Sequence, residues 1–404
     1  MNASRLKKLA LGIWMSIILV GAAIIFVLAT NLTLGTARGY SSDLSAAISP
    51  SPTKFPTWTP TPEHSIIYLP SATARPVSPS PTQPTSTPIT PLPGVSFYPV
   101  EDGNPLTGLE ASNDQLNRRP VAVKISSFPR GAVRPIQSGL TLADVVYEYY
   151  IEDGLTRFIA VFYGQDASRA GPVRSGRYFD EHIMRMYHSV LVFANADERV
   201  ETYLLNLAEL RPFLFVPRSD NCPPLCRDTT IRGYNNVFVD TAGVGAKISD
   251  NTKQTLRETL FGPLYNAPTL PVVNWIYIHY SVYSYGYWEY DPAQQRYWRF
   301  SDQQDASEFT VNEVYQPHID NLNGKQVSAQ NVVVLVVPHN FNNEYDRADQ
   351  VFNIQLLGSG TAYIFREGRM IIGAWQRDKL GQPIQLVDAK ANPIPLQPGV
   401  TFYQ

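Results

Sequence analysis

The chain has 404 residues, of which 44% are hydrophobic and 17% are charged, and its formal net charge is −2. This length exceeds that of one average domain, and the apolar fraction is large enough to build a sizeable core. The near-neutral charge excludes the strongly basic composition of a typical nucleic-acid-binding protein, and two cysteines cannot form a disulfide scaffold or a four-thiolate zinc site.

The first predicted element is an apolar run near the N-terminus. Leu9–Thr30 comprises 22 residues without a charged side chain and follows a basic segment, residues 1–8. A helix that rises about 1.5 Å per residue would span the hydrocarbon core of a bilayer over this length. The basic flank favours a cytoplasmic N-terminus, so we predict one transmembrane helix and an extracytoplasmic chain after it. A cleaved signal peptide is the alternative, but its apolar region is typically about 7–15 residues long.

Residues 31–94 are predicted to form a disordered linker that is rich in Pro, Ser and Thr. Thirteen of the 33 prolines lie between Pro50 and Pro93. Proline fixes φ and has no backbone N–H to donate, so such a segment stays extended and solvated. Its reach, at about 3.1 Å per residue, suits passage through a cell-wall layer.

Residues 95–265 are predicted to form an α/β lobe. Two aromatic and β-branched runs, 143–151 and 155–163, flank Asp153-Gly154 and predict a β-hairpin. The spacing of apolar residues predicts three further elements: helices over 178–187 and 252–260, and a strand over 189–194.

Residues 271–404 are predicted to form a mostly antiparallel β lobe. Short aromatic or β-branched runs follow one another here, with glycines at the turns: 275–290, 296–300, 331–337, 351–357, 361–366 and 370–375. Such spacing favours an antiparallel sheet, a sandwich or an open barrel. The predicted fold class is therefore α+β, with the two lobes preceded by the transmembrane helix and the linker.

Motifs for cofactors and metals are missing from the sequence. It contains no GxxxxGK[ST], GxGxxG, HExxH or GxSxG, and its six histidines lack a recognised metal-ligand spacing, so we predict no cofactor and no metal. His318-Ile319-Asp320 resembles half of a metal site, but a turn histidine with satisfied hydrogen bonds is the commoner interpretation.

Cys222 and Cys226 enclose three residues, Pro223-Pro224-Leu225. Outside the cytoplasm such a pair favours a structural disulfide over a metal site. Redox catalysis normally uses the closer spacing Cys-x-x-Cys.

The densest group of polar residues lies between Asp144 and Arg177 and depends on the register of the hairpin. A two-residue turn would place Arg157 opposite Tyr150, with Glu148 diagonally on the same face. A three-residue loop would place Arg157 opposite Tyr149, with Glu148 on the other face.

Arg174 and Arg177 precede the helix predicted over 178–187. Cations at a helix start oppose the helix dipole, so their presence there needs a reason. Together with free backbone N–H groups, the two guanidiniums would bind a phosphate, a sulfate or a carboxylate. The alternative is structural ion pairing with Asp144, Glu148 or Glu152.

Two further groups have both a binding and a structural interpretation. Asp228 and Asn236 would either meet a ligand beside the arginines or only shape turns. The aromatic residues between Trp275 and Tyr290 would either stack against sugar rings or pack across strands.

The sequence resembles the YerB-like family of bacterial envelope lipoproteins, domain of unknown function 3048, over nearly all of residues 100–404. The most specific segments are Gly154-Leu155-Thr156-Arg157-Phe158 and Gly171-Pro172-Val173-Arg174-Ser175-Gly176-Arg177. Asn104-Pro105-Leu106-Thr107-Gly108-Leu109 resembles the opening motif of the family, and Trp288-Glu289-Tyr290-Asp291 resembles part of its second domain. The resemblance implies an envelope location and a two-domain build, and it carries over no catalytic residue. The chain departs from the family in lacking a lipid-anchoring cysteine after the apolar run and a glycine-rich turn around Asn195-Ala196-Asp197.

We therefore predict a single-pass protein of the cell membrane whose extracytoplasmic part is a binding module for an anionic or glycan ligand, such as peptidoglycan or an anionic wall polymer. The predicted ligand-binding residues are Arg157, Arg174 and Arg177, oriented by Asp144 and Glu148, with Asp228 and Asn236 beside them. One alternative is a wall-associated hydrolase that uses Glu148, Glu152 or Asp228 as acid or base. Another is a scaffold that recruits wall-building proteins.

Overall fold

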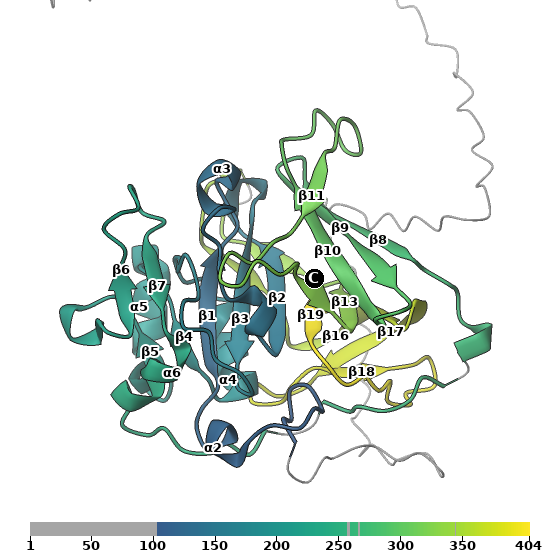
Figure 1. Cartoon of the computed structure of the whole chain (residues 1–404), viewed down its shortest axis with the longest axis horizontal. Helices are drawn as coiled ribbons and strands as arrows, with labels where there is room; N and C mark the ends of the chain where they lie inside the picture. The colour runs from purple at the N-terminus through teal and green to yellow at the C-terminus, as the bar shows by residue number, and fades with distance from the viewer. Residues whose placement is uncertain (1–102, 257–258, 266, 344) are drawn as a thin grey trace, which may run out of the picture. The chain divides into compact units, whose positions relative to one another are not determined.

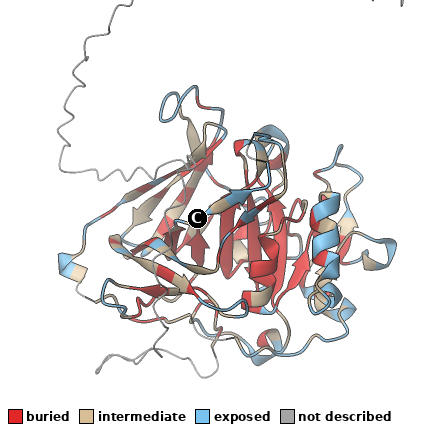
Figure 2. Cartoon of the chain, turned by 180° about the vertical axis from the view of Figure 1, so that it is seen from behind, coloured by how far each residue is buried: buried red, intermediate tan, exposed pale blue. Residues whose placement is uncertain are grey.

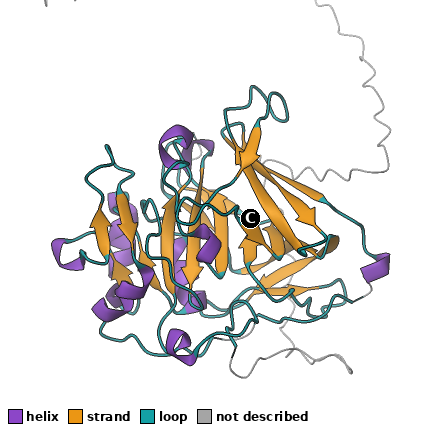
Figure 3. Cartoon of the chain, in the orientation of Figure 1, coloured by secondary structure: helices purple, strands orange, loops and turns teal. Residues whose placement is uncertain are grey.

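The computed structural model describes residues 103–256, 259–265, 267–343 and 345–404 (Figure 1). The transmembrane helix predicted over residues 9–30 and the linker predicted over 31–94 lie outside these ranges. Within them, no helix is both long enough and apolar enough to cross a membrane. The described chain is a mixed α+β structure with many strands and few, short helices (Figure 3).

A mixed ten-stranded sheet forms the centre of the fold. Its strands, in spatial order, are β18 (Gln385–Val387), β17 (Arg369–Arg377), β16 (Gly358–Arg366), β13 (Asn331–Leu335), β19 (Thr401–Tyr403), β2 (Val145–Tyr150), β3 (Thr156–Phe162), β1 (Val121–Ser126), β4 (Val190–Val192) and β5 (Leu214–Phe215).

The remaining strands form smaller sheets. A five-stranded sheet contains β11 (Tyr315–Pro317), β10 (Arg296–Asp302), β9 (Ser284–Asp291) and β8 (Trp275–Ser281), with β12 (Ser328–Ala329) paired to β10. Two hairpins are formed by β6 (Leu225–Arg227) with β7 (Val237–Val239) and by β14 (His339–Phe341) with β15 (Phe352–Ile354). The α-helices are α2 (Asn113–Leu116), α3 (Arg130–Val133), α4 (Asp180–Tyr187), α5 (Glu198–Asn206) and α6 (Thr241–Val244).

The central sheet joins the two predicted lobes. Strand β19, from the C-terminal part of the chain, pairs in parallel with β2, so that Phe402 lies opposite Val146. Its other edge pairs in parallel with β13. The boundary near residues 265–271 is therefore a boundary along the sequence, whereas the backbone hydrogen bonds of the sheet continue across it.

The hairpin between β2 and β3 has the three-residue loop that was one of the two predicted alternatives. The backbone N–H of Ile151 donates to the carbonyl of Leu155 at 2.8 Å, which closes the loop Glu152–Gly154. Asp153 and Gly154 have positive φ angles of 59° and 76°, which a tight loop requires and which glycine adopts readily. Arg157 consequently lies opposite Tyr149.

The prediction of a helix over 178–187 and of a strand over 189–194 is confirmed by α4 and β4. The prediction of a helix over 252–260 is wrong, because the described residues 252–256 and 259–260 are not helical. Only Leu256 and Leu260 are apolar in this stretch, and two leucines give a weak amphipathic pattern. The carbonyl of Leu260 instead accepts the backbone N–H of Leu396 at 2.8 Å, so pairing with a distant segment outweighs the local preference.

The central sheet is buried on both faces, as the strands at the centre of Figure 2 show. One face, which includes Tyr147 and Ile159, packs in the same hydrophobic cluster as Ile183 of α4 and Leu204 of α5. The opposite face packs against the five-stranded sheet, with Trp288 edge-on to Phe402 at 4.8 Å between ring centroids. Because side chains alternate along a strand, Lys124, Tyr149 and Arg157 lie on the face that α4 covers.

Candidate anion-binding site

Four cationic side chains gather beside the N-terminal end of α4: Lys124, Arg157, Arg174 and Arg177. We call them the cationic cluster. Lys124 comes from β1 and Arg157 from β3, whereas the two other arginines come from the segment that leads into α4. This segment lies along β1, because the N–H of Arg174 donates to the carbonyl of Lys124 at 3.0 Å. Main-chain pairing thus places the predicted arginines over the sheet.

One carboxylate serves two of these arginines. Arg177 donates from Nε to Oε2 of Glu152 at 3.0 Å and makes a second hydrogen bond from Nη2 to Oε1. Nη2 of Arg157 lies 3.8 Å from the same Oε1. Burial opposes ionisation of Glu152, but the hydrogen bonds and charge of Arg177 hold its pKa below the ordinary value. Arg177 therefore has the structural partner that the alternative interpretation foresaw.

A second carboxylate, Asp180 of α4, is enclosed together with Lys124. The ammonium group of Lys124 lies 2.8 Å from Oδ1 of Asp180, and both side chains are fully buried. The hydroxyl of Tyr149 donates to the same Oδ1 at 2.5 Å, and the N–H of Arg177 donates to Oδ2 at 2.9 Å. Burial lowers the pKa of Lys124 to about 7, and the charge of Asp180 only partly opposes this effect.

Arg174 has no carboxylate partner within 4.0 Å among the described residues. Its guanidinium carbon lies 4.5 Å from the ring centroid of Tyr234, a side chain that is 64% exposed. Its Nε is buried and has no hydrogen-bond partner in the described part of the chain. Burial, followed by the charges of Arg177 and Arg174, lowers the pKa of Arg157 to about 9. The four cations of the cluster thus share two carboxylates, and the positive charge is left in excess.

Asp144 does not orient the arginines. It accepts hydrogen bonds from Asn104 Nδ2 at 2.8 Å and from the N–H groups of Tyr163 and Gly164 at 2.6 and 2.9 Å. Asp144 immediately precedes β2. Tyr149, the cross-strand neighbour of Arg157, lies five residues further along the chain and therefore about 17 Å from Asp144 in an extended strand. Burial raises the pKa of Asp144 to about 6, against these donors. The side chain of Asp144 therefore stabilises the loop that contains Tyr163 and Gly164.

Glu148 also lies away from the cationic cluster, because the three-residue loop turns it to the other face of the sheet. There it accepts a hydrogen bond from Arg299 of β10 at 2.6 Å and another from the hydroxyl of Thr156 at 2.8 Å. It borders cavities of only about 10 and 70 Å³. Its role is to link the central sheet to the five-stranded sheet.

Asp228 and Asn236 lie at the loop end of the β6–β7 hairpin and do not contact the cationic cluster. Asp228 pairs with Arg169 at 2.9 Å, and Asn236 accepts a hydrogen bond from Arg227 at 3.0 Å. The loop between them carries Tyr234, which does contact the cluster through Arg174. The two residues shape the loop, and the tyrosine between them reaches the site.

Two other sequence features have clear places in the structure. Cys222 and Cys226 are joined by a disulfide. His318 is buried and contacts Gln137 and Arg299, while Asp320 accepts hydrogen bonds from the backbone and the hydroxyl of Thr141, so this pair is satisfied as a turn. No group of three or more potential metal ligands occurs within the described ranges.

Around residue 195, where the family resemblance leads us to expect a glycine-rich turn, this chain has Asn195 instead. Asn195 has a φ of 68°, in the left-handed region that asparagine tolerates better than most residues. Its carbonyl accepts the N–H of Gly176 at 2.9 Å. The absence of glycine therefore leaves the backbone next to Arg177 intact.

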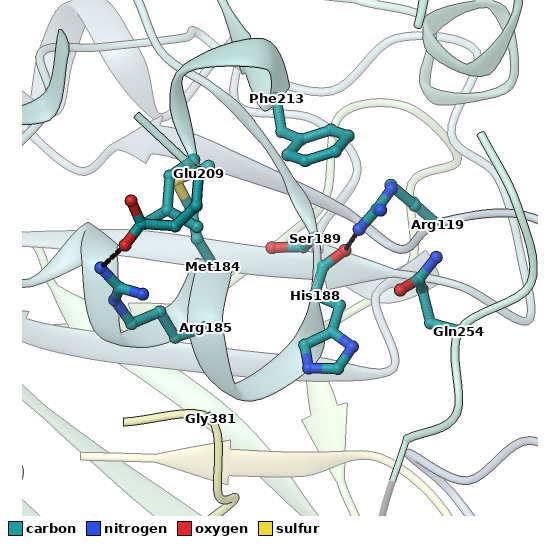
Figure 4. A pocket seen from close by; sticks show the side chains of 10 residues that line it. Arg119, Met184, Arg185, His188, Ser189, Glu209, Phe213, Gln254 and Gly381 are labelled. Atoms are coloured by element: carbon teal, nitrogen blue, oxygen red, sulfur yellow. Dashed lines mark hydrogen bonds and ion pairs between the residues drawn. The ribbon is translucent and has the colours of Figure 1, made fainter. Parts of the chain in front are cut away.

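A separate cavity of about 300 Å³ lies near the end of α4 and contains none of the predicted site residues (Figure 4). Its arginines are already paired. Arg119 contacts Asp250 at 2.8 Å and covers the ring of Phe213, and Arg185 contacts Glu209 at 2.5 Å. This cavity offers less unpaired charge than the cationic cluster.

Comparison with known proteins places this architecture in a family. Residues 106–255 match the N-terminal domain, and residues 276–403 the C-terminal domain, of the protein family of unknown function DUF3048. The chain is 28% identical, over 305 residues, to a Bacillus subtilis (strain 168) protein named "Putative lipoprotein YerB", covering 74% of this chain and 84% of the relative.

The crystal structure of the Bacillus subtilis YerB protein has the same fold. It matches with a TM-score of 0.58 at 24% identity, over 74% of this chain and 94% of the solved chain. The predicted resemblance is thus confirmed by the family models, the relative and the fold. The chain belongs to the DUF3048 family and contains both of its domains.

Proposed function

We propose that this chain is a membrane-anchored binding module of the cell envelope and that the cationic cluster holds the phosphate or carboxylate groups of an anionic wall polymer. Two features support the location. The related Bacillus subtilis protein carries the name "Putative lipoprotein YerB", and the apolar run Leu9–Thr30 has the length of a membrane anchor.

The observation that supports an anionic ligand is the environment of Arg174. Arg174 is only partly buried and has no carboxylate partner among the described residues, so an anion would supply the missing counter-charge and hydrogen-bond acceptors. Arg157 belongs to the same cluster, and its carboxylate partner, Glu152, also pairs with Arg177. An incoming oxyanion therefore needs to displace no ion pair in order to reach Arg174.

The hydrolase alternative receives less support. Each of its three carboxylates already has an arginine partner: Glu148 pairs with Arg299, Glu152 with Arg177 and Asp228 with Arg169. A general base needs a free lone pair directed at a substrate, and these pairs occupy the carboxylate oxygens.

The test is binding of poly(glycerol phosphate) to the purified full-length protein at two salt concentrations. Arg174→Gln is expected to lower the affinity at least tenfold and to reduce its salt dependence, because one charged contact is lost. Arg211→Gln removes an equal charge from an exposed position outside the cluster and serves as the matched control. Absence of binding by the wild-type protein, or equal affinity and salt dependence in the Arg174→Gln variant, would overturn the proposal.

A further inference from the structure

The sheet formed by β8, β9 and β10 has two chemically different faces. The inner face carries Ile276, Ile278, Trp288 and Tyr297, all of which are at most 9% exposed and pack toward the central sheet. The outer face carries a group of rings, which we call the aromatic face: Trp275, Tyr277, Tyr287, Trp298, Phe300 and the neighbouring Tyr315 of β11. These strands are largely tan in Figure 2, because most of the outer rings are half-buried.

The rings form an ordered array. Tyr277, Tyr287 and Phe300 are direct cross-strand neighbours, and their successive ring centroids are 5.3 and 4.5 Å apart. Tyr315 packs edge-on against Tyr287 at 4.9 Å. Each ring thus restricts the rotation of the next, so little side-chain entropy remains to be lost on binding.

The array has a size that suits a short stretch of polymer. A second cross-strand row, Trp275, Glu289 and Trp298, lies two residues along the strands from the first. Three strands at about 4.8 Å spacing and two rows about 7 Å apart give an area of roughly 10 by 7 Å, the size of one or two sugar rings.

The composition of this face distinguishes between classes of ligand. Its two rows contain no Val, Ile or Leu, in contrast to the inner face, and consist of five aromatic rings and the carboxylate of Glu289. Phenols and indoles offer apolar ring surface together with a polar group at the edge. A pyranose has the matching arrangement, with C–H groups on its faces and hydroxyls around its edge.

The charged residues beside the rings are mainly acidic, which disfavours binding of the polyanion that we propose for the cationic cluster. Glu289 lies within the second row, and Asp291 accepts a hydrogen bond from Trp298 Nε1 at 3.3 Å. Glu313 lies next to Tyr315, whose hydroxyl donates to it at 2.6 Å. Arg296 lies over the ring of Trp298, and His279 Nε2 lies 2.8 Å from Oε1 of Glu313. The three carboxylates outnumber the guanidinium of Arg296 and the imidazole of His279, so a polyanion is repelled, whereas carboxylates accept hydrogen bonds from sugar hydroxyls.

We propose that the aromatic face binds an uncharged glycan chain, at a site separate from the cationic cluster. Tyr277 is its most accessible ring, since it is 37% exposed and β8 is an edge strand of its sheet. The glycan lies across β8, β9 and β10, with its ring faces on Tyr277 and Trp298 and its hydroxyls toward Glu289 and Asp291. The proposal stands independently of the proposed function.

The experiment titrates the full-length protein, in a sugar-free detergent, with a neutral N-acetylglucosamine hexamer and follows tryptophan fluorescence and calorimetric heat. Tyr277→Ala is expected to weaken binding at least fivefold, while Tyr277→Phe, which retains the ring, stays within twofold of the wild type. Tyr345→Ala is the matched control, because Tyr345 is 89% exposed and lies outside this sheet. Thermal unfolding verifies that each variant is folded.

Two further arms distinguish binding at the aromatic face from binding elsewhere on the chain and from capture of a peptide. Excess poly(glycerol phosphate) is expected not to displace the hexamer, since it is repelled by the aromatic face. Displacement would place the hexamer at the cationic cluster and overturn the proposal. Equal binding by Tyr277→Ala and the wild type, no binding of the hexamer, or binding only of a peptide copy of the chain's own proline-rich residues 76–93 would overturn it as well.

Discussion

Lys124 and Asp180 form an ion pair that is completely enclosed, with Nζ 2.8 Å from Oδ1 and no exposed surface on either side chain. The ring of Tyr149 lies 4.0 Å from the same Nζ. Arg157 and Arg177 lie close enough to lower the pKa of Lys124 further, after the larger effect of burial. The charge of the cationic cluster therefore changes near neutral pH, where Lys124 loses its proton before Arg157, whose pKa is about 9.

The affinity for a polyanion is expected to fall as the pH rises from 6 to 8.5. The pKa of Lys124 is lowered to about 7, so Lys124 loses its proton and the cluster one positive charge in this range. The change should be at least about fivefold, because a unit charge about 8–16 Å from the ligand contributes about 1–2 kcal/mol at an effective dielectric constant near 20. Poly(glycerol phosphate) is the appropriate probe, since its phosphodiesters do not titrate in this range. A Lys124→Met variant that kept the same pH dependence would contradict the assignment.

Stability is expected to respond to pH in the opposite direction. The pKa of Lys124 falls from 10.5 to about 7 on folding, so between these values the unfolded chain binds more protons than the folded one. The contribution of Lys124 to stability therefore rises with pH across this window, with a slope of at most about 1.4 kcal/mol per pH unit. Urea unfolding at pH 7, 8 and 9 measures it. Subtracting the same series for Lys124→Met isolates this residue, and a zero difference in slope would show that Lys124 stays protonated.

Replacement of Glu152 by glutamine is expected to strengthen anion binding while it lowers stability. Glu152 neutralises Arg177 and approaches Arg157, so its loss leaves both guanidiniums available to a ligand. We expect affinity for poly(glycerol phosphate) to increase about tenfold, the reverse of the effect of Arg174→Gln. Stability should fall by about 2–4 kcal/mol, because buried positive charge loses its partner. Weaker binding in the Glu152→Gln variant would instead make Glu152 a supporting residue of the ligand site.

The contact between Glu148 and Arg299 is expected to matter for stability and not for anion binding. Arg299→Met leaves Glu148 buried without its 2.6 Å partner, and such uncompensated charges typically cost about 3–5 kcal/mol. Denaturant unfolding measures the loss, and Glu148→Gln combined with Arg299→Met should recover part of it. Titration of the same variants with poly(glycerol phosphate) should give the wild-type affinity. A tenfold loss there would return Glu148 to the binding site.

Much of the secondary structure near the site could be predicted from the sequence, because its signals are local. The aromatic runs around Asp153-Gly154 predict the hairpin, and the spacing of apolar residues predicts α4. The faces are harder to assign, since a one-residue change in loop length moves every side chain to the other side of the sheet. The alternative with a two-residue turn therefore places Glu148 on the same face as the arginines. In the structure Glu148 lies on the opposite face of the sheet.

The residues that surround the predicted arginines could be predicted only in part. Lys124 stands in the run Val121–Ser126 among residues that are all buried, and a lone lysine in such a strand is a signal for a buried charge that could have identified it. Asp180 and Tyr234 carry no comparable signal, because their contacts depend on how distant segments meet. The helix predicted over 252–260 failed for the same reason.

The position of β19 has a consequence for how the protein is made. This strand fills the gap between β2 and β13, yet it follows the nine other described strands of the central sheet in sequence. Until Thr401–Tyr403 arrive during synthesis or export, β2 has an open edge, and open edges of buried strands recruit other chains. The N-terminal family domain is therefore expected to aggregate or to need a chaperone when it is produced alone, and its completion must wait for Thr401–Tyr403.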